Sequence, residues 1–360
     1  MKGSQQVSPG VGLRRRVLSW PTLATTVVAA TVLGLVLWQA FDIDWTELRK
    51  TILGISPVSY ALALGLYYTS FWFRGYRWRL ISKTAGIGGP TGERVPGTFT
   101  MGGIILMGWF ANSVAFLRVG DAYRGWVLSR QTGASFGESL GTILAERVQD
   151  MVAVLLLVLV AAAWISADPD VEVPLVVLVA AVLLVALLVT LLLAMRRYGQ
   201  KIARLVPSRF RGAYENFQRG TLASFNARGL PLQLGLGIAG WSLEMLRFYF
   251  VADGLGIDIS FGVIMFAALA NAMLSTIPTP GGFGFVEGGL PGLLILMGLD
   301  DTSAVGLTIV DRTISWLSVI VFGGLLFLYW NVFRKGKGSS GAEQTTGAAP
   351  SQSVLAQPES

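Results

Sequence analysis

The chain contains no cysteine and no histidine among its 360 residues. Without them there can be no disulfide, thiol nucleophile, thiolate metal site or imidazole base. The sequence also lacks a glycine-rich loop ending in Gly-Lys-Ser or Gly-Lys-Thr, which excludes a P-loop ATPase. Any chemistry must therefore use carboxylates, arginines, hydroxyls or the backbone, and we expect no metal and no cofactor.

Charge is also scarce. Only 14% of the residues are charged, 53% are apolar, and the mean hydropathy is +0.60. A soluble protein carries about a quarter charged residues, whereas several apolar runs here reach the roughly 20 residues that cross a bilayer. The composition predicts an all-α integral membrane protein. The net charge of +7 does not indicate nucleic-acid binding, because the basic residues gather in alternate loops.

The distribution of charge predicts about six full transmembrane helices and two re-entrant or broken hairpins. The full helices are expected near residues 20–40, 57–81, 136–166, 174–195, 230–253 and 302–333. The first hairpin enters from the cytoplasm over 97–117 and stays or returns there by 121–131. The second enters from outside over 260–277 and returns over 285–299. This topology places both termini in the cytoplasm of a multi-pass protein of the cell membrane.

The remaining segments are polar. We expect residues 1–16 and 336–360 to be a disordered cytoplasmic leader and tail, because small and polar residues predominate there. Residues 17–335 would form one polytopic membrane domain, with an outer interfacial loop over 42–56. The basic segment 196–229 has two equally open interpretations, an amphipathic helix on anionic headgroups and an ordinary solvated loop.

The most informative segment is a break in a hydrophobic helix. It consists of Pro278, Pro280, Gly281, Gly282 and Gly284, and Glu287 follows in apolar sequence. Freed backbone groups in a bilayer must be buried in protein or face a watery cavity, and a carboxylate at that depth marks a functional-site candidate. The half-helix end could receive a phosphate oxygen, or Glu287 could cap it and take up a proton or a cationic headgroup. The alternative is a close helix crossing through small residues.

A second candidate is the charged cluster of Glu146, Arg147 and Asp150. Spacings of three and four residues allow these side chains to share a helix face. Arginine can bind phosphate through two parallel hydrogen bonds while carboxylates hold its guanidinium group. The alternative is an ion cluster that only locks helices together.

Asp311 and Arg312 form the corresponding pair near the outer end of a later helix. Together the two pairs would provide a charged group at each leaflet, which suits a headgroup passed between them. Glu244 and Arg247 would line the same cavity, although a self-neutralising structural pair explains them better.

These elements suggest a weak internal repeat with inverted topology. The matched residues are Asn112 with Glu146-Arg147 in one half and Asn271 with Asp311-Arg312 in the other. Inverted repeats with interrupted helices are typical of secondary transporters that bind substrate near the midplane; chance similarity is the alternative. The first hairpin also carries Arg118, Asp121 and Arg124, either as a second charged elbow or as a plain basic loop.

The motifs resemble the membrane-domain family that includes the flippase portion of lysylphosphatidylglycerol synthases and stand-alone UPF0104 proteins. They cover about residues 20–333 and comprise Arg74-Gly-Tyr-Arg77-Trp78, Asn112, Arg118-Val-Gly-Asp121-Ala-Tyr-Arg124, Glu146-Arg147-Val-Gln-Asp150, Pro278 to Gly284 with Glu287, and Asp311-Arg312 before Trp316. The sequence departs from the family pattern at Phe116, where the family usually has proline, and at Asp121, where it usually has glutamate.

The resemblance implies a lipid translocase for a phospholipid or a polyprenyl-phosphate-linked glycolipid. Arg147 and Arg312 would contact phosphate, and Glu146, Asp150 and Asp311 would orient them. The expected partners are membrane lipids, not nucleic acid; a second copy of the chain and a separate lipid-modifying enzyme remain open. The alternative functions are a membrane-embedded transferase of lipid or cell-envelope glycan synthesis, with Asp42/Asp44 or Glu146/Asp150 as base, and a scaffold of such a complex.

Overall fold

The computed structural model describes residues 43–89, 92, 94–115, 118–165 and 175–332. The predicted leader, the helix near residues 20–40 and the tail lie outside the described residues. The helices are α3 Trp45–Leu53, α4 Pro57–Thr84, α5 Thr98–Val114, α6 Val119–Thr132, α7 Phe136–Ile165, α8 Leu175–Leu205, α9 Ser208–Ala223, α10 Leu230–Gly254, α11 Phe261–Leu274, α12 Phe285–Leu296, α13 Asp301–Arg312 and α14 Gly324–Val332. No strand occurs in these ranges, and the all-α prediction is confirmed.

The long helices have the dimensions and composition of membrane spans. Three are long and apolar enough to cross a bilayer, Phe136–Ile165, Leu178–Leu205 and Asp301–Asn331, and the pair α3 and α4, bent by 75°, would count as a fourth. α10 coincides with the span predicted near residues 230–253, and it contains two buried charged side chains, Glu244 and Arg247. The fold is that of a multi-pass membrane protein.

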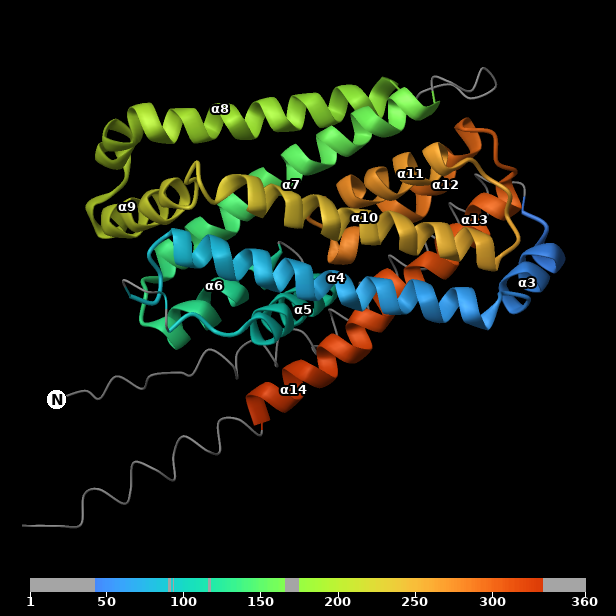
Figure 1. Ribbon diagram of the computed structural model, residues 1–360, viewed down its shortest axis with the longest axis horizontal. Helices are drawn as coiled ribbons and strands as arrows, with labels where there is room; N and C mark the ends of the chain where they lie inside the picture. The colour runs from blue at the N-terminus through green and yellow to red at the C-terminus, as the bar shows by residue number, and fades with distance from the viewer. Residues whose placement is uncertain (1–42, 90–91, 93, 116–117, 166–174, 333–360) are drawn as a thin grey trace, which may run out of the picture.

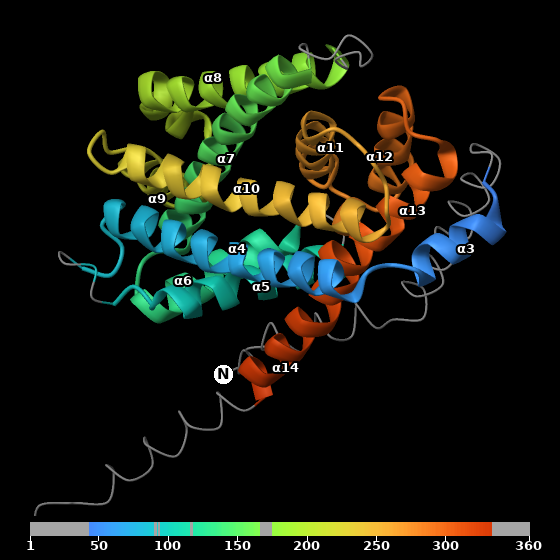
Figure 2. The same cartoon turned by 45° about the vertical axis from the view of Figure 1, so that its right-hand side comes forward.

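The two central helices, α4 and α10, lie side by side and antiparallel (Figures 1 and 2). At one end, the Ser56 amide donates to the Gly254 carbonyl over 2.8 Å. At the other end, the Gln233 side chain donates to Thr84 Oγ1 over 3.2 Å. The end of α4 and the end of α10 therefore lie at opposite ends of the bundle.

Each central helix is followed by a helical hairpin. The α5–α6 hairpin follows α4, and the α11–α12 hairpin follows α10, so the two enter from opposite ends of the bundle. Their tips meet in the middle, where Arg118 Nη1 of the first donates to the Thr276 carbonyl of the second over 2.9 Å. The structure thus contains the two predicted broken hairpins, and they face each other.

The first tip closes through a close contact between α5 and α6. The Gly120 amide donates to Asn112 Oδ1 over 2.8 Å. A Cβ atom on Gly120 would lie 1.9 Å from the Gly108 carbonyl oxygen, so a side chain has no room there. Arg118, directly before α6, has a φ of 50°, which is uncommon for a residue other than glycine.

The second tip is built by the predicted Pro/Gly break. Pro280–Gly282 forms a single 3₁₀ turn, in which Gly281 has a φ of 59°. Glu287 Oε2 then accepts from the Gly284 amide over 2.7 Å and caps the start of α12. The sequence left open whether this helix end receives a phosphate oxygen or is capped by Glu287. The structure shows that Glu287 caps it.

The last span is continuous but unevenly wound. Between α13 and α14 lie two π-helical turns, Thr313–Leu317 and Val319–Gly323. Such wide turns are frequent at functional sites. Here they directly follow Arg312 and contain Ser315 and Trp316, which line the cavity described below.

Two segments differ from the sequence-based expectation. The predicted outer loop at 42–56 contains helix α3, because Asp44 accepts from the Thr46 and Glu47 amides over 2.8 and 3.0 Å and caps it. The basic segment 196–229 is largely helical: α8 continues to Leu205, and α9 lies beside α7 (Figure 1). The solvated-loop interpretation is therefore wrong for α9, whereas contact with headgroups stays a prediction.

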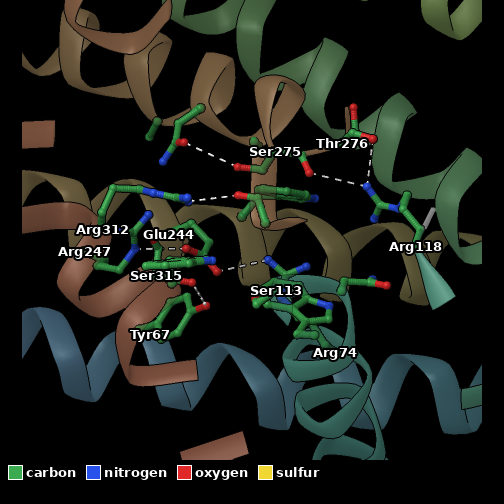
Figure 3. Close-up of a pocket in the computed structure, with 18 of the residues that line it drawn as sticks. Tyr67, Arg74, Ser113, Arg118, Glu244, Arg247, Ser275, Thr276, Arg312 and Ser315 are labelled. Carbon is green, nitrogen blue, oxygen red and sulfur yellow. Dashed lines mark hydrogen bonds and ion pairs between the residues drawn. The ribbon is translucent and has the colours of Figure 1, made fainter. Parts of the chain in front are cut away.

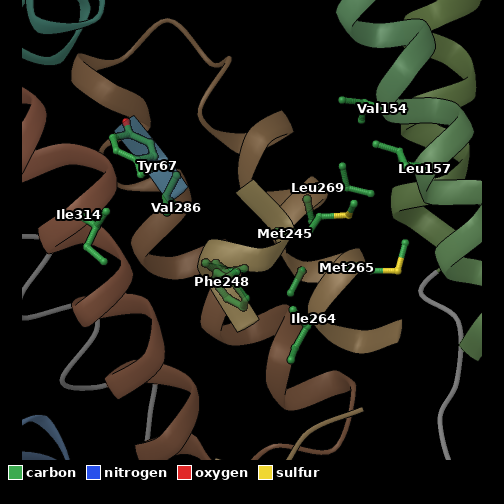
Figure 4. Packing of buried hydrophobic residues seen from close by; sticks show 14 of the residues in the cluster. Tyr67, Val154, Leu157, Met245, Phe248, Ile264, Met265, Leu269, Val286 and Ile314 are labelled. Carbon is green, nitrogen blue, oxygen red and sulfur yellow. The ribbon is translucent and has the colours of Figure 1, made fainter. Parts of the chain in front are cut away.

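The apolar core extends through α4, α5, α7, α10, α13 and the second hairpin, and Figure 4 shows part of it. Phe248 of α10, Leu269 of α11 and Val286 of α12 are each fully buried. In contrast, α8 leaves Leu183 and Leu187 63% and 55% exposed. A contiguous apolar surface of this kind is costly in water, which suits a helix that faces lipid.

Candidate functional site

A cavity of about 130 Å³ lies where the two hairpin tips meet α4, α7, α10 and the first π-helical turn. Its volume is about ten times what a single water needs. Its charged lining consists of five arginines and one carboxylate, namely Arg74, Arg118, Arg147, Arg247, Arg312 and Glu244. Its aromatic lining consists of Tyr67, Trp109, Trp241 and Trp316. Among the described residues the wall is therefore strongly basic.

Arg118 and Arg312 approach the second hairpin tip from opposite sides (Figure 3). Arg118 Nη1 donates to the carbonyls of Thr276 and Ser275 over 2.9 and 3.4 Å. Arg312 Nη1 donates to the Gly281 carbonyl over 3.0 Å. Carbonyls freed by a helix break need such partners inside a membrane. The arginines therefore support the broken backbone and face the cavity at the same time.

Arg74 contacts two indole rings. Its guanidinium carbon lies 4.9 Å from the centroid of Trp109 and 4.7 Å from that of Trp241. Its Nη2 also donates to Glu244 Oε1 over 3.2 Å. Cation–π contacts with two indoles, together with the ion pair, fix the position of the guanidinium group. Arg74 is thus a preorganised part of the cavity wall.

Glu244 and Arg247 form the expected structural pair, with 3.0 Å between Arg247 Nε and Glu244 Oε2. Both residues also line the cavity. They are therefore a structural ion pair and part of the cavity wall at the same time. Arg247 additionally pairs with Asp311. Glu244 therefore lies between Arg74 and Arg247 and is engaged by both.

The expected orienting carboxylates hold other arginines. Glu146 pairs with Arg124 and lies 3.6 Å from Arg77, and Asp150 accepts from Arg77 over 2.6 Å. Arg147 is instead held by Asp121 over 2.9 Å. The prediction that Glu146 and Asp150 orient Arg147 is not what the contacts show. Glu146, adjacent to Arg147, points in a different direction, and Asp150 is held by Arg77 of α4.

The same correction applies in the second half. Asp311 pairs with Arg247 and accepts from Asn271 over 3.2 Å, while Arg312 pairs with Glu287 over 2.8 Å. Arg147 and Arg312 line one cavity, whereas the sequence suggested a charged group at each leaflet. Glu146, Asp150, Asp121, Arg124 and Asp311 lie behind the wall.

The two halves nevertheless repeat one arrangement. In each, a carboxylate is the third residue of the hairpin's returning helix, Asp121 in α6 and Glu287 in α12. In each, this carboxylate pairs with an arginine of the long helix that follows, Arg147 or Arg312. The two asparagines differ, because Asn112 accepts within its own hairpin whereas Asn271 donates to Asp311. The repeat is thus clearer in the ion pairs than in the sequence.

Several site residues were not predicted from the sequence. Arg74 and Arg77 belong to one of the motifs of the resemblance but carry no expected site role, yet both are buried and paired with carboxylates. The signal was their position one turn apart, with Trp78 beside them, inside an apolar helix. The four aromatic residues of the lining have no comparable sequence signal, because single aromatics in membrane helices are usually packing residues.

The wall contains buried donors without a hydrogen-bond partner. They include Arg147 Nε, Arg312 Nη2, Thr279 Oγ1 and Trp316 Nε1, all on lining residues. Buried polar atoms in proteins are nearly always hydrogen-bonded. Six of the thirteen unpartnered buried atoms in the described residues are on lining residues, and donors of this kind can serve the oxygens of an anion. In the described ranges, no acidic cluster is placed to hold a metal ion.

The comparisons with known proteins agree with this architecture. The family model for the lysylphosphatidylglycerol synthase TM region matches residues 23–323. A UPF0104 membrane protein of Methanocaldococcus jannaschii is 33% identical over 222 residues, covering 61% of this chain and 93% of the relative. A UPF0104 membrane protein of Pyrococcus horikoshii is 23% identical over 333 residues, covering 84% of this chain and 95% of the relative. The chain therefore belongs to the lysylphosphatidylglycerol synthase transmembrane-region family.

Proposed function

We propose that this protein binds the phosphate group of a membrane lipid in the arginine-lined cavity and moves the headgroup between the leaflets. The observation that carries the proposal is the set of five arginines gathered where two broken hairpins meet. Guanidinium groups bind phosphate through paired, charge-assisted hydrogen bonds. Several of their donors here have no protein partner.

The hairpins supply a route to either side. Because they enter from opposite ends of the bundle, each tip would separate the cavity from one leaflet. Loosening one tip at a time would expose the same site alternately, as in transporters built from inverted repeats. The family description, which refers to the membrane region of a synthase of an aminoacylated phospholipid, also favours a lipid substrate.

The transferase alternative draws less support from the geometry. Glu146 and Asp150, the proposed bases, both lie within ion-pair distance of Arg77. Both carboxylates are buried behind the cavity wall and do not line the cavity, so neither faces a bound substrate. Of the other candidates, Asp42 lies outside the described residues and Asp44 caps α3.

The test is lipid movement in proteoliposomes with fluorescent phosphatidylglycerol in one leaflet. We expect the purified protein to accelerate movement, and Arg147→Ala to slow it at least about tenfold through loss of charge-assisted hydrogen bonds. Glu287→Gln, which keeps an acceptor for the Gly284 amide but removes the charge facing Arg312, should also slow it. Arg209→Ala, an exposed arginine of α9, is the matched control.

Either of two results would contradict the proposal. One is movement that survives both Arg147→Ala and Glu287→Gln. The other is no acceleration by folded wild-type protein with any of phosphatidylglycerol, aminoacylated phosphatidylglycerol and a short polyprenyl-phosphate sugar. The second result, combined with turnover of a lipid-linked donor, would favour the transferase.

A further inference from the structure

The ion pairs around the cavity contain more positive than negative groups. In the described part of the chain they join seven arginines and six carboxylates: Arg74, Arg77, Arg118, Arg124, Arg147, Arg247 and Arg312 with Asp121, Glu146, Asp150, Glu244, Glu287 and Asp311. With every group ionised, the network carries one positive charge in excess. Uncompensated charge in a low-dielectric interior is costly, so a counter-charge is expected.

The excess can be located. Two groups of ion pairs are neutral: Arg312 with Glu287, and Arg74 and Arg247 with Glu244 and Asp311. The unbalanced group contains four arginines and three carboxylates, and its list is Arg77, Arg118, Arg124 and Arg147 with Asp121, Glu146 and Asp150. This group spans the first hairpin, the first half of α7 and Arg77 of α4.

Within that group the surplus faces the cavity. Arg77 and Arg124 lie behind the wall and are engaged by Asp150 and Glu146. The two lining arginines of this group share one ion-pair partner, Asp121, which lies 2.9 Å from Arg147 and 3.6 Å from Arg118. Both lining side chains are partly accessible, with 24% and 27% of their surface exposed. One further negative charge in the cavity would therefore complete the network.

The wall is poorly suited to a cationic headgroup. Glu244, the lining carboxylate, is already engaged by two arginines, 3.2 and 3.0 Å away. An ammonium group entering the cavity would meet guanidinium groups and no free carboxylate among the lining residues. A doubly negative phosphate monoester would instead leave a net negative charge after binding.

We propose that the headgroup taken up by the cavity carries one net negative charge, as a phosphodiester whose remaining part is uncharged. The phosphate would lie between Arg147 and Arg118 on one side and Arg312 on the other, close to the unpaired donors of Arg147, Arg312 and Trp316. This inference rests on the proposed function and narrows its substrate class. It separates phosphatidylglycerol and polyprenyl-phosphate sugars from zwitterionic and aminoacylated phospholipids.

The experiment compares lipids of different charge in the same proteoliposomes. Fluorescent phosphatidylglycerol is singly negative, phosphatidylethanolamine zwitterionic, phosphatidate doubly negative and lysylphosphatidylglycerol positive. We expect phosphatidylglycerol to move about tenfold faster than the others, the effect of one charge-assisted contact. Equal rates for all four lipids, or faster movement of the positive lipid, would overturn the inference while leaving the proposed function in place.

A variant without the surplus charge tests whether that charge causes the preference for phosphatidylglycerol. Arg118→Gln removes the surplus charge but keeps an amide donor for the second hairpin's carbonyls. The ratio of phosphatidylglycerol to phosphatidylethanolamine movement should fall about tenfold towards parity, whereas Arg118→Lys and the distant control Arg209→Gln should retain the preference. A purely structural role would slow both lipids without changing their ratio.

A binding measurement covers the case in which no lipid moves or the variant does not fold. Native mass spectrometry of the wild-type protein in equal mixtures of the four lipids should show phosphatidylglycerol retained preferentially. Equal retention would overturn the charge inference. Preferential retention without any transport would support it and contradict the translocase.

Discussion

At the residue scale, the ion pairs reflect how costly a buried charge is. Arg77 is 1% exposed and donates to Asp150 over 2.6 Å, and the Trp241 indole donates to the same carboxylate oxygen over 3.1 Å. Removing one partner of such a pair leaves the other charge uncompensated, which usually costs more than the pair itself contributes. These residues behind the cavity wall should therefore matter for stability before they matter for substrate.

We predict that Arg77→Met destabilises the folded protein by about 3–5 kcal/mol. In the double variant Arg77→Met with Asp150→Asn, much of this loss should be recovered, because the uncompensated carboxylate is gone. The measurement is a double-mutant cycle of thermal unfolding in detergent micelles. Additive effects of the two substitutions would show that Arg77 and Asp150 are not energetically coupled.

At the element scale, the hairpin tips depend on close backbone contact. The first tip brings Gly120 so near to the Gly108 carbonyl that α5 and α6 would have to separate to admit a methyl group. The hydrogen bond from the Gly120 amide to Asn112 would then be lost as well. Because Arg118 directly precedes this helix, its contact with the second hairpin depends on the same closure.

We predict that Gly120→Ala destabilises the protein by at least about 1–3 kcal/mol, the usual cost of forcing extra volume into a packed interior. Gly65→Ala in α4 is the matched control, because a Cβ atom there meets nothing within 4 Å. Thermal unfolding of both variants gives the comparison. Equal melting temperatures for the two would contradict the close contact between α5 and α6.

At the scale of the whole molecule, the sequence predicted the helices and the helix break well, but it did not predict which side chains form ion pairs. The Pro278–Gly284 break and the long helices α7 and α10 are local features of apolar length and backbone chemistry, and the structure has them where predicted. Ion-pair partners are decided by tertiary packing. Spacing along one helix suggested that Arg147 pairs with Asp150, whereas Asp150 accepts from Arg77 of α4. Sequence spacing cannot reveal a partner that another helix supplies.

The absence of cysteine makes alternating access directly measurable, since single cysteines can be placed in an unreactive background. Ser113 on the first hairpin and Ala272 on the second both line the cavity. If the tips open in turn, Ser113→Cys and Ala272→Cys should each react with a membrane-impermeant thiol reagent applied from either side. Added phosphatidylglycerol should slow both reactions.

The exposed position Ser208 at the start of α9 provides the control, because Ser208→Cys should react from one side only and independently of lipid. Labelling of both cavity cysteines from the same single side would mean that the site opens to one leaflet. A cavity with that behaviour could bind a lipid headgroup but could not pass it between hairpins that enter from opposite ends. The rate from the second side therefore decides between a translocase and a one-sided lipid-binding protein.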